Sequence, residues 1–239
     1  FEGLVNCAAM ADVECCESHL QESQRINAES PRVLARVCAQ RGARLIHFST
    51  DYVLDGMREG LKGEGAAVRP LNQYARTKLM GEEGVLEENG NAVVGRVSWL
   101  FGTEPDGIVE SVFRSARRGE DLRAVNDKFS KPTSVREIGR VVRVLLGRPE
   151  VAGLFHLTHP GEPESWWSVA TKIVRAGYEA GLLGHCPEVE PDAMARAERL
   201  RTVRPVHTAM DPARLRTDLH WQGVSWEEEA RLRLGSLPA

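Results

Sequence analysis

Tyr74 and Lys78 are the residues of this chain whose types and spacing indicate chemistry most directly. Residues four apart on a helix share one face, so the phenol and the ammonium can reach the same small volume. A free tyrosine ionises near pH ~10 and a nearby cation favours the phenolate, so this spacing predicts that Lys78 lowers the pKa of Tyr74. Such a tyrosine can exchange a proton with a carbonyl or alcohol oxygen near neutral pH. A carbonyl reductase needs this proton transfer beside a hydride donor.

A second group of polar residues lies upstream of this pair. Ser49, Thr50, Asp51 and Tyr52 follow an apolar run that begins near residue 44. Taken alone, the tyrosine–lysine pair could be an ordinary exposed pair on a helix, and Thr50 could simply end a strand. Because the two groups occur together at this distance, we favour a catalytic arrangement that includes the Thr50 hydroxyl, which can both donate and accept a hydrogen bond.

The hydrophobic pattern predicts the elements that position these residues. Apolar runs predict strands at 4–9, 44–49, 92–97, 122–125 and 153–157, and helical periodicity predicts helices at 14–41, 108–118, 134–146, 165–182, 211–219 and 225–234. Another helix is expected to carry Tyr74 and Lys78 and to end near Asn89. Strands that alternate with helices indicate an α/β fold with a parallel sheet, and continuous apolar strands fit a sheet covered on both faces.

Composition excludes several classes of protein. The formal net charge of −3 gives no basic field for nucleic acid, and no apolar run approaches the ~20 residues of a membrane span. The first residues lack the pattern of a signal peptide. Five cysteines without paired spacing predict neither a disulfide framework nor a zinc site, and the seven histidines show no ligand spacing. We therefore expect a cytoplasmic protein without a metal.

The expected dinucleotide signature is absent from the printed sequence. A dinucleotide fold carries a Gly-rich phosphate turn after its first strand, and no G-x-G-x-x-G occurs here. If the fold is of this type, two strand–helix units, about 60 residues at roughly 30 each, are expected to precede the sequence. The chain is therefore expected to be an N-terminally truncated form.

Two strings, at residues 46–56 and 70–82, resemble the dTDP-4-dehydrorhamnose reductase family of extended short-chain dehydrogenase/reductases. The resemblance continues at residues 5–9, at Asn27, at 96–102, at 132–134 and at Arg204-Pro205. It implies a Rossmann-type parallel sheet from residues 1–100 with about 133–157, and a smaller C-terminal substrate-binding part from 101–132 and 158–239. It also implies reduction of the 4-keto group of a nucleotide-linked deoxysugar by NADPH or NADH, most closely that of dTDP-4-dehydrorhamnose to dTDP-L-rhamnose.

The resemblance also implies roles for individual residues. Tyr74 would protonate the ketone oxygen, Thr50 would hydrogen-bond that oxygen, and Lys78 would hold the nicotinamide ribose. The cofactor-binding residues would be Ala8, Ala9, Ser49, Tyr74, Lys78 and Trp99. The substrate-binding residues would be Tyr52, Arg96, Trp99 and Arg204. For Trp99, packing in the core is the alternative.

The chain also departs from the family pattern. Residues 128–131, Lys-Phe-Ser-Lys, replace a Gln-x-Gly-type turn, so the substrate loop is expected to differ. Sugar 4,6-dehydratases resemble this family but carry an Asp-Glu pair after the threonine. Here Tyr52 follows Asp51, which argues against elimination chemistry.

Three alternatives stay open at this stage. The regulatory β subunit of methionine adenosyltransferase resembles the same family and acts as a binding partner, and Trp99 favours the reductase over it. The chain as printed could bind no dinucleotide and be inactive. A homodimer is a further possibility, and no motif decides it.

Overall fold

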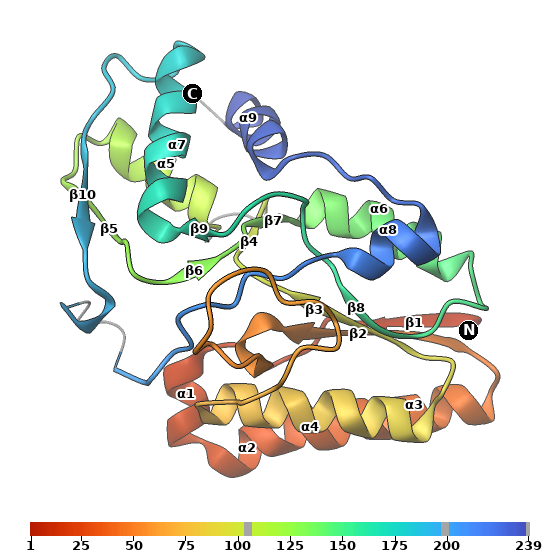
Figure 1. The fold of residues 1–239 in the computed structure, drawn as a ribbon. Coiled ribbons are helices and arrows are strands. Elements are labelled where there is room, and N and C mark those ends of the chain that lie inside the picture. Colours follow the sequence, from red (N-terminus) through yellow and green to blue (C-terminus); the bar gives the residue numbers. More distant parts are fainter. Residues whose placement is uncertain (103–106, 197–200, 238–239) are drawn as a thin grey trace.

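A four-stranded parallel sheet organises the chain (Figure 1). The structure, a computed structural model, describes residues 1–102, 107–196 and 201–237. The predicted substrate-binding ranges 101–132 and 158–239 extend over residues 103–106, 197–200 and 238–239, which lie outside the described residues. The strand order is β1-β2-β3-β8, and all three pairings are parallel. The strands are β1 (Gly3–Asn6), β2 (Arg44–Thr50), β3 (Val93–Val97) and β8 (Gly153–His156). The α/β prediction is confirmed.

Helices cover both faces of this sheet, as the continuous apolar strands predicted. The helices α3 (Ser30–Gln40) and α4 (Gln73–Glu88) contact one face, and α6 (Val135–Leu146) and α8 (Ala213–Leu219) contact the other (Figure 1). Side chains alternate between the faces of a strand. Leu45 therefore packs in the core beneath α3 and α4, whereas Ile46 packs with α6 and α8.

The single helix predicted at 14–41 is divided in the structure. It comprises α1 (Val13–Ser18), α2 (Leu20–Gln24), a π-helical segment η1 (Arg25–Glu29) and α3. His19 adopts a non-helical conformation between α1 and α2. Pro31 lies in the first turn of α3, where its missing N–H costs little. The boundaries at 14–41 are therefore wrong in detail, because hydrophobic periodicity does not detect a local change of helix type.

The helix that carries Tyr74 and Lys78 is fixed at its start and near its middle. Asn72 caps α4 by accepting a hydrogen bond from the Ala75 amide at 2.9 Å. Gly81 allows a close approach to η1, since a Cβ atom there would lie 2.2 Å from the Asn27 carbonyl oxygen. These contacts set the position of the helix relative to the sheet.

A second apolar core lies beyond the carboxyl edge of the sheet (Figure 1). The helices α5 (Ile108–Arg117), α7 (Trp166–Glu179) and α9 (Trp226–Ser236) pack around Phe113, Ile173 and Leu234. Small sheets complete this part of the chain: β5 (Leu122–Val125) with β10 (Val189–Asp192), β4 (Leu100–Phe101) with β7 (Thr133–Ser134), and β6 (Phe129–Ser130) with β9 (Glu164–Ser165). No helix in the described ranges combines the length and apolarity that crossing a bilayer requires.

Candidate active site

Tyr74 and Lys78 lie near the start of α4, beside the end of β2. The Lys78 side chain is buried, with 2% of the residue exposed, and its ammonium donates to the Phe48 carbonyl at 2.6 Å. Thr50 is the last residue of β2, and its hydroxyl accepts from the Tyr52 amide at 3.2 Å. The carboxyl end of a parallel sheet is where such folds bind their ligands. The predicted catalytic residues therefore converge at the expected edge.

Burial raises the pKa of Tyr74 to about 12, and a hydrogen bond with Thr50 opposes this rise. The prediction that Lys78 lowers the Tyr74 pKa is wrong for this structure. Lys78 is not among the groups that shift the Tyr74 pKa, and its ammonium donates to the Phe48 carbonyl. Burial lowers the pKa of Lys78 itself to about 8. At neutral pH, Tyr74 is a protonated phenol and Lys78 is mostly a cation.

Tyr52, a predicted substrate residue, lies against Tyr74. The two rings meet edge to face, with their centroids 5.9 Å apart. The Lys128 ammonium lies 4.8 Å from the Tyr52 ring centroid, and a hydrogen bond joins Arg204 to Tyr52. Burial raises the pKa of Tyr52, so its hydroxyl remains protonated. The structure thus brings Arg204, from the C-terminal part of the chain, to the same group as Tyr74.

Arg96, a predicted substrate residue, is buried in the structure. Its guanidinium forms a bidentate ion pair with Glu82 at 2.9 and 2.7 Å, and the two side chains are 3% and 4% exposed. The pair joins β3 to α4 inside the protein. The structure thus places Arg96 in an internal ion pair, which argues against a contact with substrate, and the predicted substrate role stays a prediction.

Trp99 is partly buried against the second core. Its backbone has a φ of 40°, a left-handed conformation that is uncommon for a bulky residue. Its ring lies 5.5 Å from that of Trp166, and both residues line a pocket of about 340 Å³ with Arg123 and Ala124. Strained backbone of this kind often occurs at functional sites. The predicted contacts of Trp99 with cofactor and substrate stay predictions.

The remaining predicted cofactor residues lie at the ends of β1 and β2. Ala8 and Ala9 are exposed beyond β1, and the Ala8 amide donates to the Asn6 side chain at 3.1 Å. Ser49 is buried, and its hydroxyl has no hydrogen-bond partner among the described residues.

Sequence reasoning missed the buried polar cluster behind Thr50 and Tyr52. Asp51 is 2% exposed and accepts hydrogen bonds from the hydroxyls of Ser130, at 2.8 Å, and of Thr208. Lys128 is fully buried beside it. The departure of residues 128–131 from the family pattern was the only available signal, and it predicted a different loop without indicating burial.

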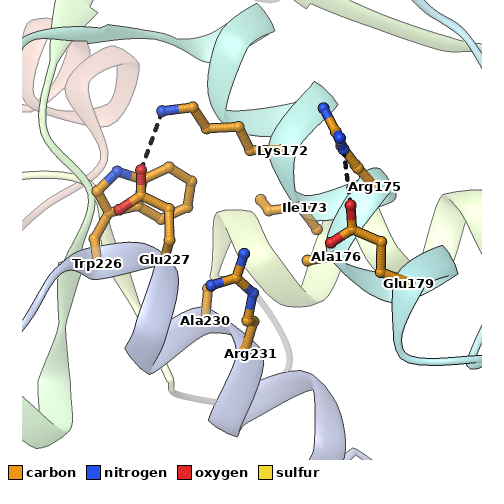
Figure 2. Close-up of a pocket in the computed structure, with 9 residues that line it drawn as sticks. All are labelled: Lys172, Ile173, Arg175, Ala176, Glu179, Trp226, Glu227, Ala230 and Arg231. Atoms are coloured by element: carbon orange, nitrogen blue, oxygen red, sulfur yellow. Dashed lines mark hydrogen bonds and ion pairs between the residues drawn. The ribbon is translucent and has the colours of Figure 1, made fainter.

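Two other polar features of the second half hold helices together. A pocket of about 300 Å³ lies between α7 and α9, where Lys172 pairs with Glu227 at 3.0 Å and Arg175 with Glu179 at 2.8 Å (Figure 2). These four charged groups thus have partners within the protein.

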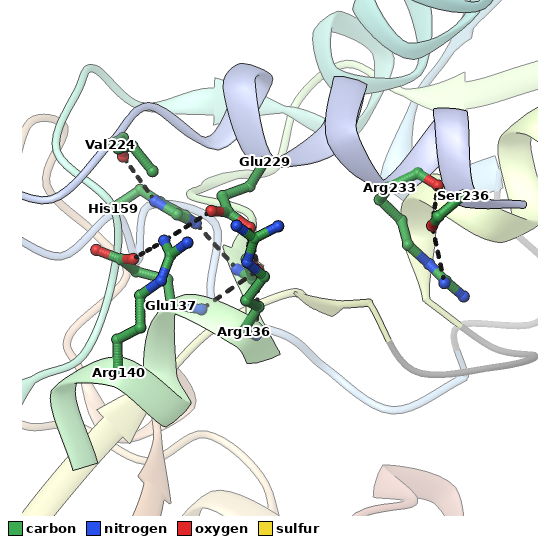
Figure 3. Close-up of polar contacts among 9 residues, drawn as sticks. Arg136, Glu137, Arg140, His159, Val224, Glu229, Arg233 and Ser236 are labelled. Atoms are coloured by element: carbon green, nitrogen blue, oxygen red, sulfur yellow. Dashed lines mark hydrogen bonds and ion pairs between the residues drawn. The ribbon is translucent and has the colours of Figure 1, made fainter. Parts of the chain in front are cut away.

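A second network joins α6 to α9 (Figure 3). Arg140 donates to Glu137 and to the buried Glu229 at 3.0 and 2.8 Å. His159 accepts from the Ser134 amide through Nε2 at 3.1 Å, so its Nδ1 donates to the Val224 carbonyl at 2.8 Å. No group of three or more His, Cys, Asp or Glu side chains in the described part of the chain could hold a metal ion.

The fold and the site together define a class. A parallel sheet covered by helices, with a threonine, a tyrosine and a lysine at its carboxyl edge, is an arrangement of the Rossmann-type α/β proteins. The chain belongs to the family described as the RmlD substrate binding domain, whose model matches residues 1–237.

Known proteins agree with this assignment. The chain is 34% identical over 185 residues to dTDP-4-dehydrorhamnose reductase of Escherichia coli. The aligned stretch covers 75% of this chain and 61% of that protein. It is 33% identical over 223 residues to dTDP-4-keto-6-deoxy-D-glucose reductase of Streptomyces niveus, which covers 91% of this chain and 75% of that protein. The chain thus spans 61% of the length of the Escherichia coli relative.

Solved structures also share the fold. The crystal structure of a dTDP-4-dehydrorhamnose reductase from Clostridium acetobutylicum matches with a TM-score of 0.88 at 28% identity, over 98% of this chain and 80% of that chain. The enzyme of that name from Bacillus anthracis, solved in complex with NADP, matches with a TM-score of 0.87 at 27% identity, with the same coverage.

Proposed function

We propose that the protein containing this chain reduces the 4-keto group of a nucleotide-linked deoxysugar, most closely that of dTDP-4-dehydrorhamnose, to give dTDP-L-rhamnose. The observation that carries the proposal is the convergence of Thr50, Tyr52, Tyr74 and Lys78 at the carboxyl edge of a parallel sheet. Relatives that are 34% and 33% identical bear the names of reductases of this kind.

The residues at this edge fit a nicotinamide dinucleotide, either NADPH or NADH. The buried Ser49 hydroxyl lacks a partner among the described residues, and Ala8 and Ala9 lie open at the end of β1. The Lys78 ammonium has three hydrogens to donate and directs one to Phe48. We propose that Lys78 holds the ribose, that the other three residues and Trp99 line the cofactor site, and that the reduced cofactor supplies the hydride.

Tyr74 is proposed as the general acid. Reduction of a ketone to an alcohol adds one hydride to carbon and one proton to oxygen. The pKa of about 12 keeps the Tyr74 proton on the phenol at neutral pH, so the acid is in its donating form before the reaction. The hydrogen bond with Thr50 stabilises the phenolate that remains after transfer. Thr50 would also orient the substrate ketone.

The substrate would lie against Tyr52 and Trp99. Tyr52 borders the acid directly, and Arg204, which is hydrogen-bonded to Tyr52, also pairs with Glu14 at 3.0 Å. An arginine at this position suits the anionic part of a nucleotide sugar. We propose that residues 1–100 with 133–157 hold the cofactor, and that 101–132 and 158–239 complete the substrate side.

The test uses the full-length protein that contains this sequence. NADPH absorbance is followed with dTDP-4-dehydrorhamnose, comparing wild type with Tyr74→Phe, which removes only the acidic hydroxyl. Turnover is expected to fall by about 10²–10⁴-fold while the Kd for NADPH stays unchanged. Turnover of Tyr74→Phe near the wild-type rate would overturn the assignment of Tyr74.

A second variant tests the cofactor site. Lys78→Met should raise the Kd for NADPH and lower turnover together, because it removes the proposed ribose contact. An unchanged Kd would remove support for that role. NADPH binding without turnover in the wild type would instead favour a regulatory binding subunit, to be followed by capture of a partner protein.

We propose a cytoplasmic location because all five cysteines are free thiols. A homodimer is the remaining proposal about partners. Light scattering of the purified full-length protein gives its mass directly, and a monomer at micromolar concentration would contradict it.

A further inference from the structure

Lys128 is a fully buried lysine in the part of the chain that departs from the family pattern. Its exposed fraction is 0%, and its ammonium donates to the Pro205 carbonyl at 2.7 Å. Burial lowers the Lys128 pKa to about 8, and the nearby Asp51 carboxylate opposes this shift, so the ammonium is mostly charged at neutral pH. Lysines are almost never fully buried unless they have a partner. The position of this cation therefore needs a reason.

The Lys128 ammonium lies over a substrate-side aromatic ring. The distance from its nitrogen to the Tyr52 ring centroid is 4.8 Å, which is within the range of a cation–π contact. The same ring meets Tyr74 edge to face, and its hydroxyl is hydrogen-bonded to Arg204. Tyr52 is thus held through its ring and through its hydroxyl.

Asp51 connects the segments that carry Ser130 and Thr208 to the turn that carries Tyr52. Its Oδ2 accepts from the Ser130 hydroxyl, next to Lys128 in the chain, and from the Thr208 hydroxyl, near Pro205. Its Oδ1 accepts from Thr50 at 3.4 Å. The hydrogen bonds from Ser130 and Thr208 to Asp51 therefore hold the turn that carries Thr50 and Tyr52 against two distant segments.

Lys131 is a second buried lysine, and its charged neighbours differ from those of Lys128. It is 1% exposed, burial lowers its pKa to about 8, and its ammonium donates to the Gly161 carbonyl at 3.2 Å. Its charged neighbours are Asp211, Arg216 and Glu162 rather than groups of the Tyr52 cluster. Lys131 is therefore a control for the cost of removing a buried ammonium from this loop.

We propose that Lys128 is a positioning residue that, together with Asp51, holds Tyr52 in place against Tyr74 so that the sugar is oriented for reduction. The inference rests on the proposed reductase function. Lys128 acts through Tyr52, so its loss should weaken sugar binding more than it slows the chemical step. A purely structural role would instead reduce the fraction of folded enzyme, which lowers apparent turnover and leaves KM unchanged.

The test compares Lys128→Met with Lys131→Met in the full-length protein. Lys128→Met is expected to raise KM for dTDP-4-dehydrorhamnose about tenfold, with little change in the Kd for NADPH. Lys131→Met is expected to lower stability, to leave the Kd for NADPH unchanged and to raise KM less than Lys128→Met does. Equal KM values for the two variants would overturn the proposal. If Lys128→Met does not fold, the variant Asp51→Asn/Lys128→Met removes both charges together, and its KM must still rise.

A second measurement separates this inference from the proposed function. The free energy of unfolding is measured for Lys128→Met, Tyr52→Leu and the variant with both changes. The two changes are expected to be non-additive, since each removes the same contact. Additive changes in the free energy of unfolding would contradict the contact between Lys128 and Tyr52, whether or not the enzyme reduces the keto-sugar. Coupling without turnover of the keto-sugar by the wild type would leave the contact standing and reject the reductase function.

Discussion

Replacement of Arg96 by methionine should lower stability strongly and leave substrate affinity unchanged. The Arg96 and Glu82 side chains are 3% and 4% exposed and share two hydrogen bonds of 2.9 and 2.7 Å. Removal of one partner of a buried ion pair leaves an uncompensated charge and typically costs about 3–5 kcal/mol. For a chain of this size, that loss corresponds to a fall in Tm of about 6–20 °C.

The assay is urea unfolding of the full-length protein at neutral pH, with KM for the keto-sugar measured on the same samples. Two further variants sharpen it. Glu82→Met/Arg96→Met should recover much of the lost stability, because apolar replacement of a whole buried pair is often neutral. Arg36→Met is the matched control, since Arg36 also makes a bidentate pair, with Glu88, but is exposed, so it should change stability little.

The reasoning would be refuted by the opposite pattern. If Arg96→Met kept wild-type stability and raised KM for the sugar, Arg96 would be a ligand contact, and its pairing with Glu82 would not hold in the enzyme. Equal losses of stability for Arg96→Met and Arg36→Met would show that burial does not decide how much stability is lost when one partner of an ion pair is removed.

Two further predictions concern stability. Gly81→Ala should destabilise the protein by about 1–3 kcal/mol, measured by urea unfolding, because its Cβ would lie 2.2 Å from the Asn27 carbonyl oxygen. Between about pH 8 and pH 9, the free energy of unfolding should rise with pH, by roughly 2–3 kcal/mol per unit. The reason is that burial lowers the pKa values of Lys78, Lys128 and Lys131 to about 8, so the folded state releases these protons before the unfolded state does.

Each of these predictions has a control within the chain. Gly84→Ala should cost less than Gly81→Ala, because its nearest neighbour is the flexible Arg32 side chain at 3.1 Å. Equal effects at the two glycines would argue against a close backbone approach. Lys131→Met should make the rise of stability with pH shallower, because one titrating group is lost. Stability that falls between pH 8 and pH 9 would reverse the sign and contradict the lowered lysine pKa values.

Much of the fold was predictable because its signals are local. Strand β5 occupies the predicted residues, and α6 and α7 begin directly after Ser134 and Ser165, which cap them. The division of the first long helix was not predictable. Asn27 lies in the π-helical segment, is fully buried and donates to Thr77 at 3.2 Å, 50 residues further along the chain, a contact that no local pattern encodes.

The candidate site, like the fold, was predictable only where its signals are local. Helical spacing and the end of an apolar strand placed Tyr74, Lys78 and Thr50 at one edge of a sheet, because period and strand direction are properties of short segments. Charge partners and pKa values are properties of the packed chain. Sequence spacing could not show that Arg96 faces Glu82.

The sequence by itself determined the α/β order and which side chains could do chemistry. Tertiary structure alone decided that burial raises the pKa of Tyr74 while Lys78 is directed at a backbone carbonyl. It also decided that the Lys128 ammonium lies over the Tyr52 ring. The physical reason is that desolvation and the Coulomb field depend on every group nearby in space, and most of those groups are distant in the chain.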